Sequence, residues 1–523
     1  MMKFDTRLLK LYLNEFKRAQ DAPLKVQKEL LMRILRQNRN TQYGKRHGFR
    51  NIRTTKDYQE RVPIVTYDDL AEEIEMIKQG KNRVLTNKKV ALLATTSGTT
   101  GEPKLIPVTR ERTRQLKKEL MLWATFMVKR FPGLLRGKTL YFAGPPREGI
   151  TAGGVVMGSI SGYMAKKAPW FAKQKMVVPP EVYNEFDVDK KTNIIANLAL
   201  RSNITQLGFA APIEAILFFE YVQKHRHRLI NEVLLVNPRR ARKLACLPDF
   251  KPLTLWPKLQ LISCIMSDNN SPYIEQLRKK IGKKIAVKDP GIYASEGRLT
   301  IGLTNHRRAG LITATENFFE FAEKVGDDEF LPPVLINQVE QGKEYKVILT
   351  TKEGLYRYDM GDVLRVVGFK KRLPIMEFVC RENFLNIVGE LASENQLVRS
   401  VEDACRQLDM THDGFTFLPY TEDLNKKPCY ELLFEPKTKI GVDKANKFLR
   451  VVEEQLQENI QDYRQMRNEF GRMSHIRLAI VKRGGYQAFE KKRMTSSGQP
   501  KPIRVAKDYA FRDNFRIERT LLA

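Results

Sequence analysis

A short string rich in glycine and hydroxyl side chains constrains this chain more than any other segment. The string, TTSGTTGEPK at residues 95–104, directly follows an apolar run that begins at Val90. Gly98 and Gly101 carry no β-carbon, so several backbone N–H groups can converge there on one anion. The hydroxyl side chains add flexible donors, and Lys104 adds a point positive charge. The sequence therefore predicts a strand that ends in a loop suited to a polyphosphate.

The same string has two other possible interpretations. It is not the P-loop pattern GxxxxGK[ST], because Gly98 and Lys104 have a different spacing and no Ser or Thr follows Lys104. A plain surface turn of Ser, Thr and Gly is the simplest alternative. Motifs elsewhere in the chain have to decide between a turn and a binding loop.

Hydrophobic periodicity divides the 523 residues into two parts. Residues 6–40 and Thr109 to Val128 have helical spacing, strands then alternate with helices, and the pattern from 316 to 369 is β-rich. We therefore expect an α/β fold with a large N-terminal domain at residues 1–385, built from mixed sheets, helices and a β-barrel-like part. Residues 386–523 alternate helices and strands and are predicted to form a small α+β C-terminal domain.

Three segments within the large part carry more specific predictions. Residues 192–230 are predicted to be mostly helical, with an interruption from Gly208 to Pro212. Trp256 to Met266 and Lys284 to Tyr293 are predicted to be buried strands that lead into polar loops.

Composition excludes several classes of protein. A hydrophobic share of 42% fills real cores and excludes a disordered chain. The five cysteines are scattered and odd in number, with no CxxC pair, which excludes a disulfide scaffold and a zinc site and predicts free thiols. The N-terminus has no signal-peptide pattern, and the longest apolar stretch, Gly153 to Ala165, is too short to span a bilayer. We expect a soluble, cytoplasmic protein with no membrane span.

The chain is strongly basic, with 91 Lys and Arg against 60 Asp and Glu and a formal net charge of +31. The basic residues are spread along the sequence rather than gathered in an uninterrupted block, and they do not alternate with aromatic residues. No specific nucleic-acid partner is therefore expected. Attraction of anionic substrates is the next use of such a charge.

Two further motifs follow the loop in chain order. The first is YASEG, residues 293–297, and the second is YRYDMGD, residues 356–362. A lone carboxylate held after a glycine turn, such as Asp362, can accept two hydroxyl donors at once. Either motif alone has a structural explanation, because an Asp after Gly often only caps a turn. Three motifs in this order favour a binding site.

Together the three motifs resemble those of the adenylate-forming superfamily, which includes acyl-CoA synthetases, luciferases and peptide-synthetase adenylation domains. The rest of the sequence is most similar to the auxin-responsive acyl-acid amido synthetases, the Gretchen Hagen family with its bacterial and animal relatives. Matching segments span nearly the whole chain and include TQYG at 41–44, RVPI at 61–64 and NFFEF at 317–321. The resemblance implies ATP and Mg²⁺ as cofactors and a carboxylic acid and an amine, commonly an amino acid, as small-molecule partners.

The resemblance implies that the large domain, residues 1–385, binds ATP and the acyl substrate and that the small domain, residues 386–523, is mobile. It also assigns roles by position. Lys104, Glu296 and Lys501 would be catalytic, and Glu296 would hold the metal. The residues expected to bind ATP are Thr96, Ser97, Gly98, Thr99, Thr100 and Gly101 for the phosphates, Tyr293, Ala294 and Ser295 near adenine, and Asp362 and Arg381 near the ribose.

One departure from the family pattern concerns the start of the small domain. Relatives usually have a Lys there, whereas this chain has Gly389, Glu390 and Leu391. Leu391 cannot bind phosphate, so either Lys501 or another base compensates, or this half-reaction is altered or lost. Three functions stay open: an amido synthetase, a thioester ligase that shares the adenylation step, and a non-catalytic binding protein. The sequence does not identify the acid, the amine or the oligomeric state.

Overall fold

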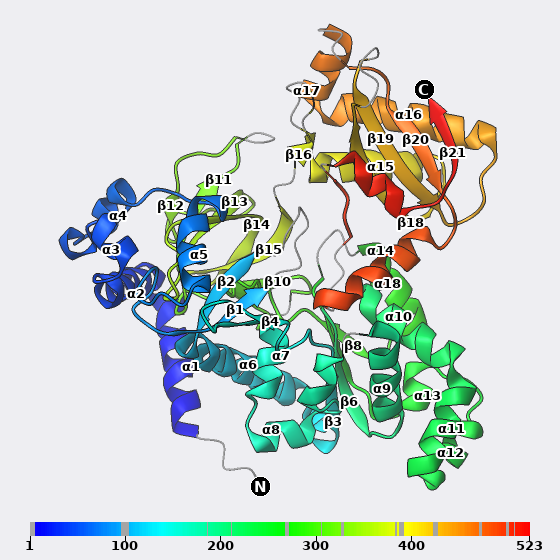
Figure 1. Ribbon diagram of the computed structural model, residues 1–523, viewed down its shortest axis with the longest axis horizontal. Coiled ribbons are helices and arrows are strands. Elements are labelled where there is room, and N and C mark those ends of the chain that lie inside the picture. The colour runs from blue at the N-terminus through cyan, green and yellow to red at the C-terminus, as the bar shows by residue number, and fades with distance from the viewer. Residues whose placement is uncertain are drawn as a thin grey trace.

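The computed structural model shows an α/β chain with a large part and a small part (Figure 1). Among the described residues, no helix is both long and apolar enough to cross a membrane. The structure describes residues 6–95, 104–185, 187–210, 212–266, 271–304, 306–325, 329–381, 384–385, 387, 392–421, 427–469, 473–497, 502–506 and 508–522.

The N-terminal segment forms two helices instead of the single stretch that the periodicity of residues 6–40 suggests. The helix is interrupted at Ala22, and Pro23 occupies the first turn of the second helix. No helical hydrogen bond is lost there, because the first N–H groups of a helix have no partner within it. The second helix ends at Asn38, within the expected region. The helices that open the chain are α1 (Thr6–Asp21), α2 (Pro23–Asn38), α3 (Gln42–Arg46), α4 (Thr55–Arg61) and α5 (Ala71–Lys78).

A mixed sheet, in the order β2-β1-β5-β4, contains the strand that leads into the glycine-rich loop. β1 pairs antiparallel with β2 and parallel with β5. Thr109 caps α6 by accepting a hydrogen bond from the Arg112 N–H, so the helix begins where its spacing predicts. The elements are β1 (Val90–Thr95), β2 (Leu105–Thr109), β4 (Gly149–Ile150), β5 (Val156–Gly158), α6 (Arg110–Arg130), α7 (Ile160–Lys166) and α8 (Trp170–Lys175).

A parallel sheet, in the order β3-β6-β7-β8, forms the next layer. β7 and β8 lie within the two predicted buried strands. The helical prediction for residues 192–230 is wrong at Ile204 to Gly208, which forms a fully buried strand. The strand contains two polar residues, Thr205 and Gln206, that are buried, so neither a polar–apolar alternation with burial nor a continuous apolar run marks it in the sequence. The elements are β3 (Lys138–Tyr141), β6 (Ile204–Gly208), β7 (Leu261–Ser263), β8 (Ala286–Lys288), α9 (Val188–Leu200), α10 (Pro212–Lys224), α11 (Arg226–Val236), α12 (Pro238–Ala245), α13 (Pro252–Leu255) and α14 (Ser271–Ile281).

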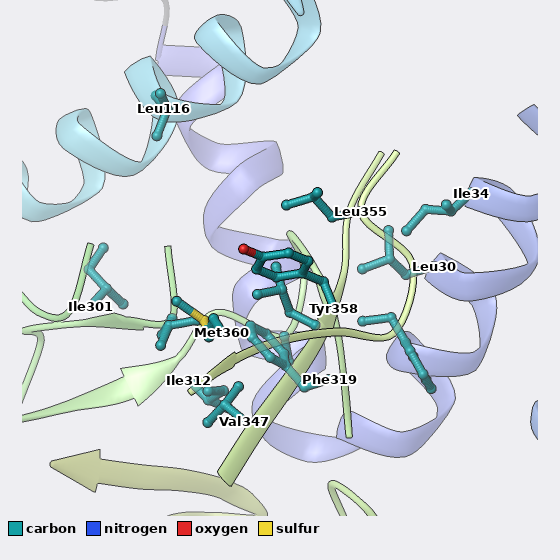
Figure 2. Packing of buried hydrophobic residues seen from close by; sticks show 14 of the residues in the cluster. Leu30, Ile34, Leu116, Ile301, Ile312, Phe319, Val347, Leu355, Tyr358 and Met360 are labelled. Atoms are coloured by element: carbon teal, nitrogen blue, oxygen red, sulfur yellow. The ribbon is translucent and has the colours of Figure 1, made fainter. Parts of the chain in front are cut away.

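The β-rich stretch forms a seven-stranded antiparallel sheet, in the order β12-β11-β13-β14-β15-β10-β9. Its core residues, including Tyr358, Met360 and Phe319, lie near Leu30 and Ile34 of α2 (Figure 2). The strands are β9 (Thr300–Ile301), β10 (Ala309–Ile312), β11 (Phe318–Glu323), β12 (Val334–Leu335), β13 (Glu344–Thr350), β14 (Tyr358–Lys370) and β15 (Leu373–Arg381).

The small part has a four-stranded sheet, β18-β19-β20-β21, with α15 and α16 packed together beside it (Figure 1). It has its own cluster of buried side chains, separate from those of the large part. The boundary between residues 385 and 386 stays a prediction. The elements are β16 (Phe384–Leu385), β17 (Ala392–Ser393), α15 (Glu394–Gln407), β18 (His412–Tyr420), β19 (Cys429–Pro436), α16 (Val442–Asn459), α17 (Gln461–Arg464), β20 (Arg477–Val481), α18 (Gly485–Ser497) and β21 (Ile517–Leu522).

Helix α18 brings the small part against the large part. Lys491 forms an ion pair with Asp189, with 2.7 Å between Nζ and Oδ1. Gln487 donates a hydrogen bond to Glu220 over 3.4 Å. The two parts therefore meet along α18, α9 and α10.

Candidate active site

The glycine-rich string connects β1 and β2, the two strands of a hairpin. Thr95 at the end of β1 lies opposite Leu105 at the start of β2. The Leu105 N–H donates to the Tyr67 hydroxyl over 2.9 Å, and the Lys104 ammonium lies 5.4 Å from the centre of the Tyr67 ring. Residues 96–101, predicted to bind phosphate, lie outside the described residues. The hairpin therefore fixes both ends of the predicted loop.

The YASEG motif forms a tight turn. Tyr293 and Arg298 form an antiparallel bridge, and the Ala294 N–H donates to the Gly297 carbonyl over 3.0 Å. Glu296 is buried within this turn, with 7% of its surface exposed. Burial raises the pKa of Tyr293 to about 12, so its phenol stays neutral at ordinary pH. The turn offers one buried carboxylate and one neutral aromatic ring.

The third motif crosses from a loop into β14. Gly361 has a φ of +73°, and its N–H donates to the Asp359 carboxylate over 2.8 Å. The next residue, Asp362, is 6% exposed and lies opposite Arg381 of β15 in the strand register. The positive φ suits a residue without a β-carbon and turns the chain just before the carboxylate that is predicted to bind ribose.

Segment 65–67 joins the first and third motifs. The Val65 N–H donates to the Arg357 carbonyl over 3.1 Å, and the Val65 carbonyl accepts from the Asp359 N–H over 2.8 Å. Two residues later, Tyr67 contacts Lys104 and Leu105. Motifs that are some 250 residues apart in sequence are thus connected through three consecutive residues.

This chain is similar to one family of known proteins both in sequence and in fold. Models of the GH3 family match it in order: the N-terminal domain at residues 12–236, the central domain at 310–381 and the C-terminal domain at 395–510. The chain belongs to the GH3 family. The matched segments extend over most of the chain, so the family assignment does not depend on residues 96–103 alone.

Relatives in the GH3 family include plant enzymes. The chain is 29% identical over 453 residues to an indole-3-acetic acid-amido synthetase of Arabidopsis thaliana, covering 77% of this chain and 74% of the relative. It is 25% identical over 432 residues to a jasmonoyl-L-amino acid synthetase of Nicotiana attenuata, covering 73% and 74%. The solved structure of the acyl acid amido synthetase AtGH3.15 with 2,4-DB superimposes with a TM-score of 0.85 at 23% identity, covering 100% of this chain and 99% of that one.

A buried charge cluster in this GH3 protein was missed by the sequence analysis. Glu119 of α6 lies 3.5 Å from a guanidinium nitrogen of Arg112 and 3.8 Å from one of Arg298, and all three side chains are at most 4% exposed. Arg298 also donates to the carbonyls of Pro290 and Thr300. Because α6 follows directly from β2, Glu119 connects the first motif to the turn that holds Glu296. Two charged positions on a helix resemble a solvated face, Arg298 follows a turn, and no sequence signal marks any of the three as buried.

A second pair missed by the sequence analysis lies behind the third motif. The Arg357 guanidinium binds the Glu320 carboxylate through two hydrogen bonds of 3.0 and 3.1 Å, and both side chains are buried. It also donates to the carbonyls of Gln59 and Val62, each over 2.8 Å. These contacts hold Arg357 at a φ of +45°, which is uncommon for a residue with a side chain.

The remaining predicted site residues have less structural description. Lys501 and Leu391 lie outside the described residues. Arg381 ends β15 opposite Asp362, and this register is the only placement the structure gives it. The roles assigned to these residues stay predictions.

The donor set around the second motif is compatible with Mg²⁺. The described residues contain no group of three or more His, Cys, Asp or Glu side chains that could form a metal cage. Mg²⁺ is usually held by one or two carboxylates together with substrate phosphates and waters. A single buried carboxylate at Glu296 fits that pattern.

Proposed function

We propose that this GH3 protein is an ATP-dependent acyl acid amido synthetase, which activates a carboxylic acid as an acyl-adenylate and transfers the acyl group to an amine. The observation that carries the proposal is the connection of three motifs through segment 65–67 and through Glu119. Lys104, Glu296 and Asp362 thereby belong to one packed region. Amide formation, with an amino acid as the amine, follows the named activities of the relatives.

In the first half-reaction the substrate carboxylate attacks the α-phosphorus of ATP, and pyrophosphate leaves. Residues 96–101 and Lys104 would hold the phosphates, and Tyr293, Ala294 and Ser295 would lie beside the adenine. Asp362 would accept the ribose hydroxyls, with Arg381 nearby. The protein contributes positioning and charge neutralisation rather than covalent chemistry.

Glu296 would hold Mg²⁺ against the phosphate oxygens. When bound, the ion neutralises part of the phosphate charge. Burial of Glu296 in a turn fixed by the Tyr293–Arg298 bridge keeps its carboxylate in one place. The chain's own contribution is thus a prearranged carboxylate.

In the second half-reaction a neutral amine attacks the acyl carbon and AMP leaves.

Lys501, which follows α18 in the sequence, is the proposed cation for the phosphate or carboxylate during adenylation, the first half-reaction. The resemblance of the GQPKP string at residues 498–502 to the family's C-terminal lysine loop supports this role. Lys501 would then supply the charge that Leu391 cannot.

The test is pyrophosphate release from ATP and Mg²⁺ across a panel of carboxylic acids, with pooled amino acids, with coenzyme A, or with neither. We expect release that depends on one class of acid and that amino acids accelerate. Lys104→Ala should abolish it, whereas Lys243→Ala, at an exposed position on α12, should not. Acceleration by coenzyme A instead would identify a thioester ligase. No acid-dependent release from folded protein would indicate a binding role.

A further inference from the structure

A basic cavity lies at the end of β1 away from the glycine-rich loop. It has a volume of about 510 Å³ and is lined at one side by Val90 and Ala91, the first residues of the strand. The loop begins only after Thr95 at the other end, and a strand of six residues extends over roughly 17–20 Å. The cavity is therefore distinct from the proposed ATP site.

One wall of the cavity is the first two turns of α6. Arg110, Thr113, Arg114 and Lys117 line it, which is the i, i+3, i+4, i+7 spacing of a single helix face. The N-terminal end of this 21-residue helix carries a partial positive charge in addition to the three cationic side chains. The wall thus presents only positive charge and a hydroxyl group.

A second wall of the cavity is the segment between α5 and β1. It contributes Lys81, Arg83, Lys88 and Lys89, all exposed, while the intervening residues 84–86 are buried. Arg83 has a φ of +58°, a left-handed conformation that is uncommon for a residue with a side chain. Its carbonyl accepts from the Gln42 N–H over 2.8 Å, which holds the backbone in place.

Glycines close one side of the cavity. A β-carbon on Gly153 would lie 2.1 Å from the carbonyl carbon of Gln79 and from the nitrogen of Gly80, so only glycine fits at this contact. The Gly153 N–H donates to the Lys78 carbonyl over 2.9 Å. This close approach brings the 153–154 turn against the end of α5 and gives the cavity its shape.

The charge of the cavity is not compensated. Eight Lys and Arg residues line it, the eighth being Lys167 at the end of α7, and no Asp or Glu does. Within the described part of the chain, none of the eight forms an ion pair with a carboxylate. Lys117 instead donates to the Lys167 carbonyl over 2.8 Å. Like charges held this close repel one another, so an anion that enters the cavity gains from all of them.

We propose that this cavity binds a small molecule that carries two or more phosphate groups, separately from the proposed catalytic site. Its volume suits a ligand of small-molecule size. The cavity is formed between a helix, a loop and a glycine turn, and this concave form favours a compact ligand over an extended nucleic acid. Bound phosphates would pair with Lys88, Lys89 and Arg114, which lie on both walls.

The test uses inorganic tripolyphosphate, titrated into the full-length protein by calorimetry at about 50 and about 200 mM salt. We expect two sites in the natural protein, the cavity and the glycine-rich loop, and weaker binding at the higher salt. The triple variant Lys88→Gln, Lys89→Gln, Arg114→Gln should keep one site and lose the other by at least tenfold. All three residues are exposed, so the variant should fold, as circular dichroism can verify.

The matched control is Arg239→Gln, Arg242→Gln, Lys243→Gln, which removes the same charge from exposed positions on α12. Equal tripolyphosphate binding by the two triple variants would overturn the proposal. So would loss, in the cavity variant, of binding to a single-stranded oligonucleotide but not to tripolyphosphate. If the proposed ATP site fails instead, the natural protein shows one site and the cavity variant none, so the two failures are distinguishable.

Discussion

Arg357 and Glu320 form a buried, two-fold hydrogen-bonded ion pair behind the segment that ends in Asp362. The guanidinium also binds the carbonyls of Gln59 and Val62, so it connects the antiparallel sheet to α4 and to the residues that follow it. The pair fixes the start of the third motif, because Arg357 lies five residues before the proposed ribose ligand.

Loss of the carboxylate at this pair should destabilise the protein strongly. Glu320→Gln leaves a buried guanidinium without its counter-charge, which typically costs about 3–5 kcal/mol in the free energy of unfolding. Urea denaturation measures it. Glu75→Gln breaks the exposed pair with Lys78 and should cost at most about 1 kcal/mol. Similar losses for the two variants would show that the buried pair does not hold the fold.

Asp362 should be required for ATP use and not for folding. If its carboxylate accepts ribose hydroxyls, Asp362→Ala loses charge-assisted hydrogen bonds worth about 1.5–3 kcal/mol each, so kcat/KM for ATP should fall roughly 10- to 100-fold per bond. Initial-rate kinetics of pyrophosphate release measure this. Glu377→Gln, which removes a carboxylate that pairs with Arg365 on the same sheet, is the control and should leave kcat/KM for ATP near its original value. An active Asp362→Ala protein would remove Asp362 from the site.

The contact between Tyr67 and the hairpin predicts a stepwise rise in KM for ATP as the tyrosine side chain is shortened. Tyr67→Phe keeps the ring beneath Lys104 but removes the acceptor of the Leu105 N–H, so KM for ATP should rise several-fold with little change in Tm. Tyr67→Ala also removes the cation–π contact, worth about 0.5–1 kcal/mol at such a site, and should raise KM further. Identical kinetics for the two variants would mean that the ring does not position Lys104.

Local sequence patterns anticipated the elements whose signals are local. The helix after Thr109 and the strands around Ile262 and Val287 are predicted from the spacing of apolar residues alone. The strand at Ile204 to Gly208 is not, because it is only five residues long and two of its buried residues, Thr205 and Gln206, are polar. Its sequence therefore shows neither the alternation of a half-buried strand nor the apolar run of a fully buried one.

Among the residues of the candidate site, some can be predicted from the sequence and others cannot. The three motifs could be located from residue types and order, because a glycine turn or a lone carboxylate can be recognised from a few consecutive residues. Glu119, Arg298 and Glu320 could not, because their partners are distant in sequence and a charged residue is normally expected at the surface. Their burial follows from tertiary packing, which a single sequence does not display.

Glu316 should make the folded state weaker as pH rises. Burial, reinforced by the neighbouring Glu119, raises the pKa of Glu316 to about 7, above the value near 4.5 of an exposed carboxyl. Between these two pH values the unfolded chain releases this proton and the folded chain keeps it. The free energy of unfolding therefore falls across that window, by up to roughly 1.4 kcal/mol per pH unit. Glu316→Gln should remove this part of the slope in urea denaturation from pH 5 to 8, whereas Glu181→Gln, at an exposed carboxyl, should run parallel to the natural protein. Parallel curves for all three proteins would mean that Glu316 is ionised throughout.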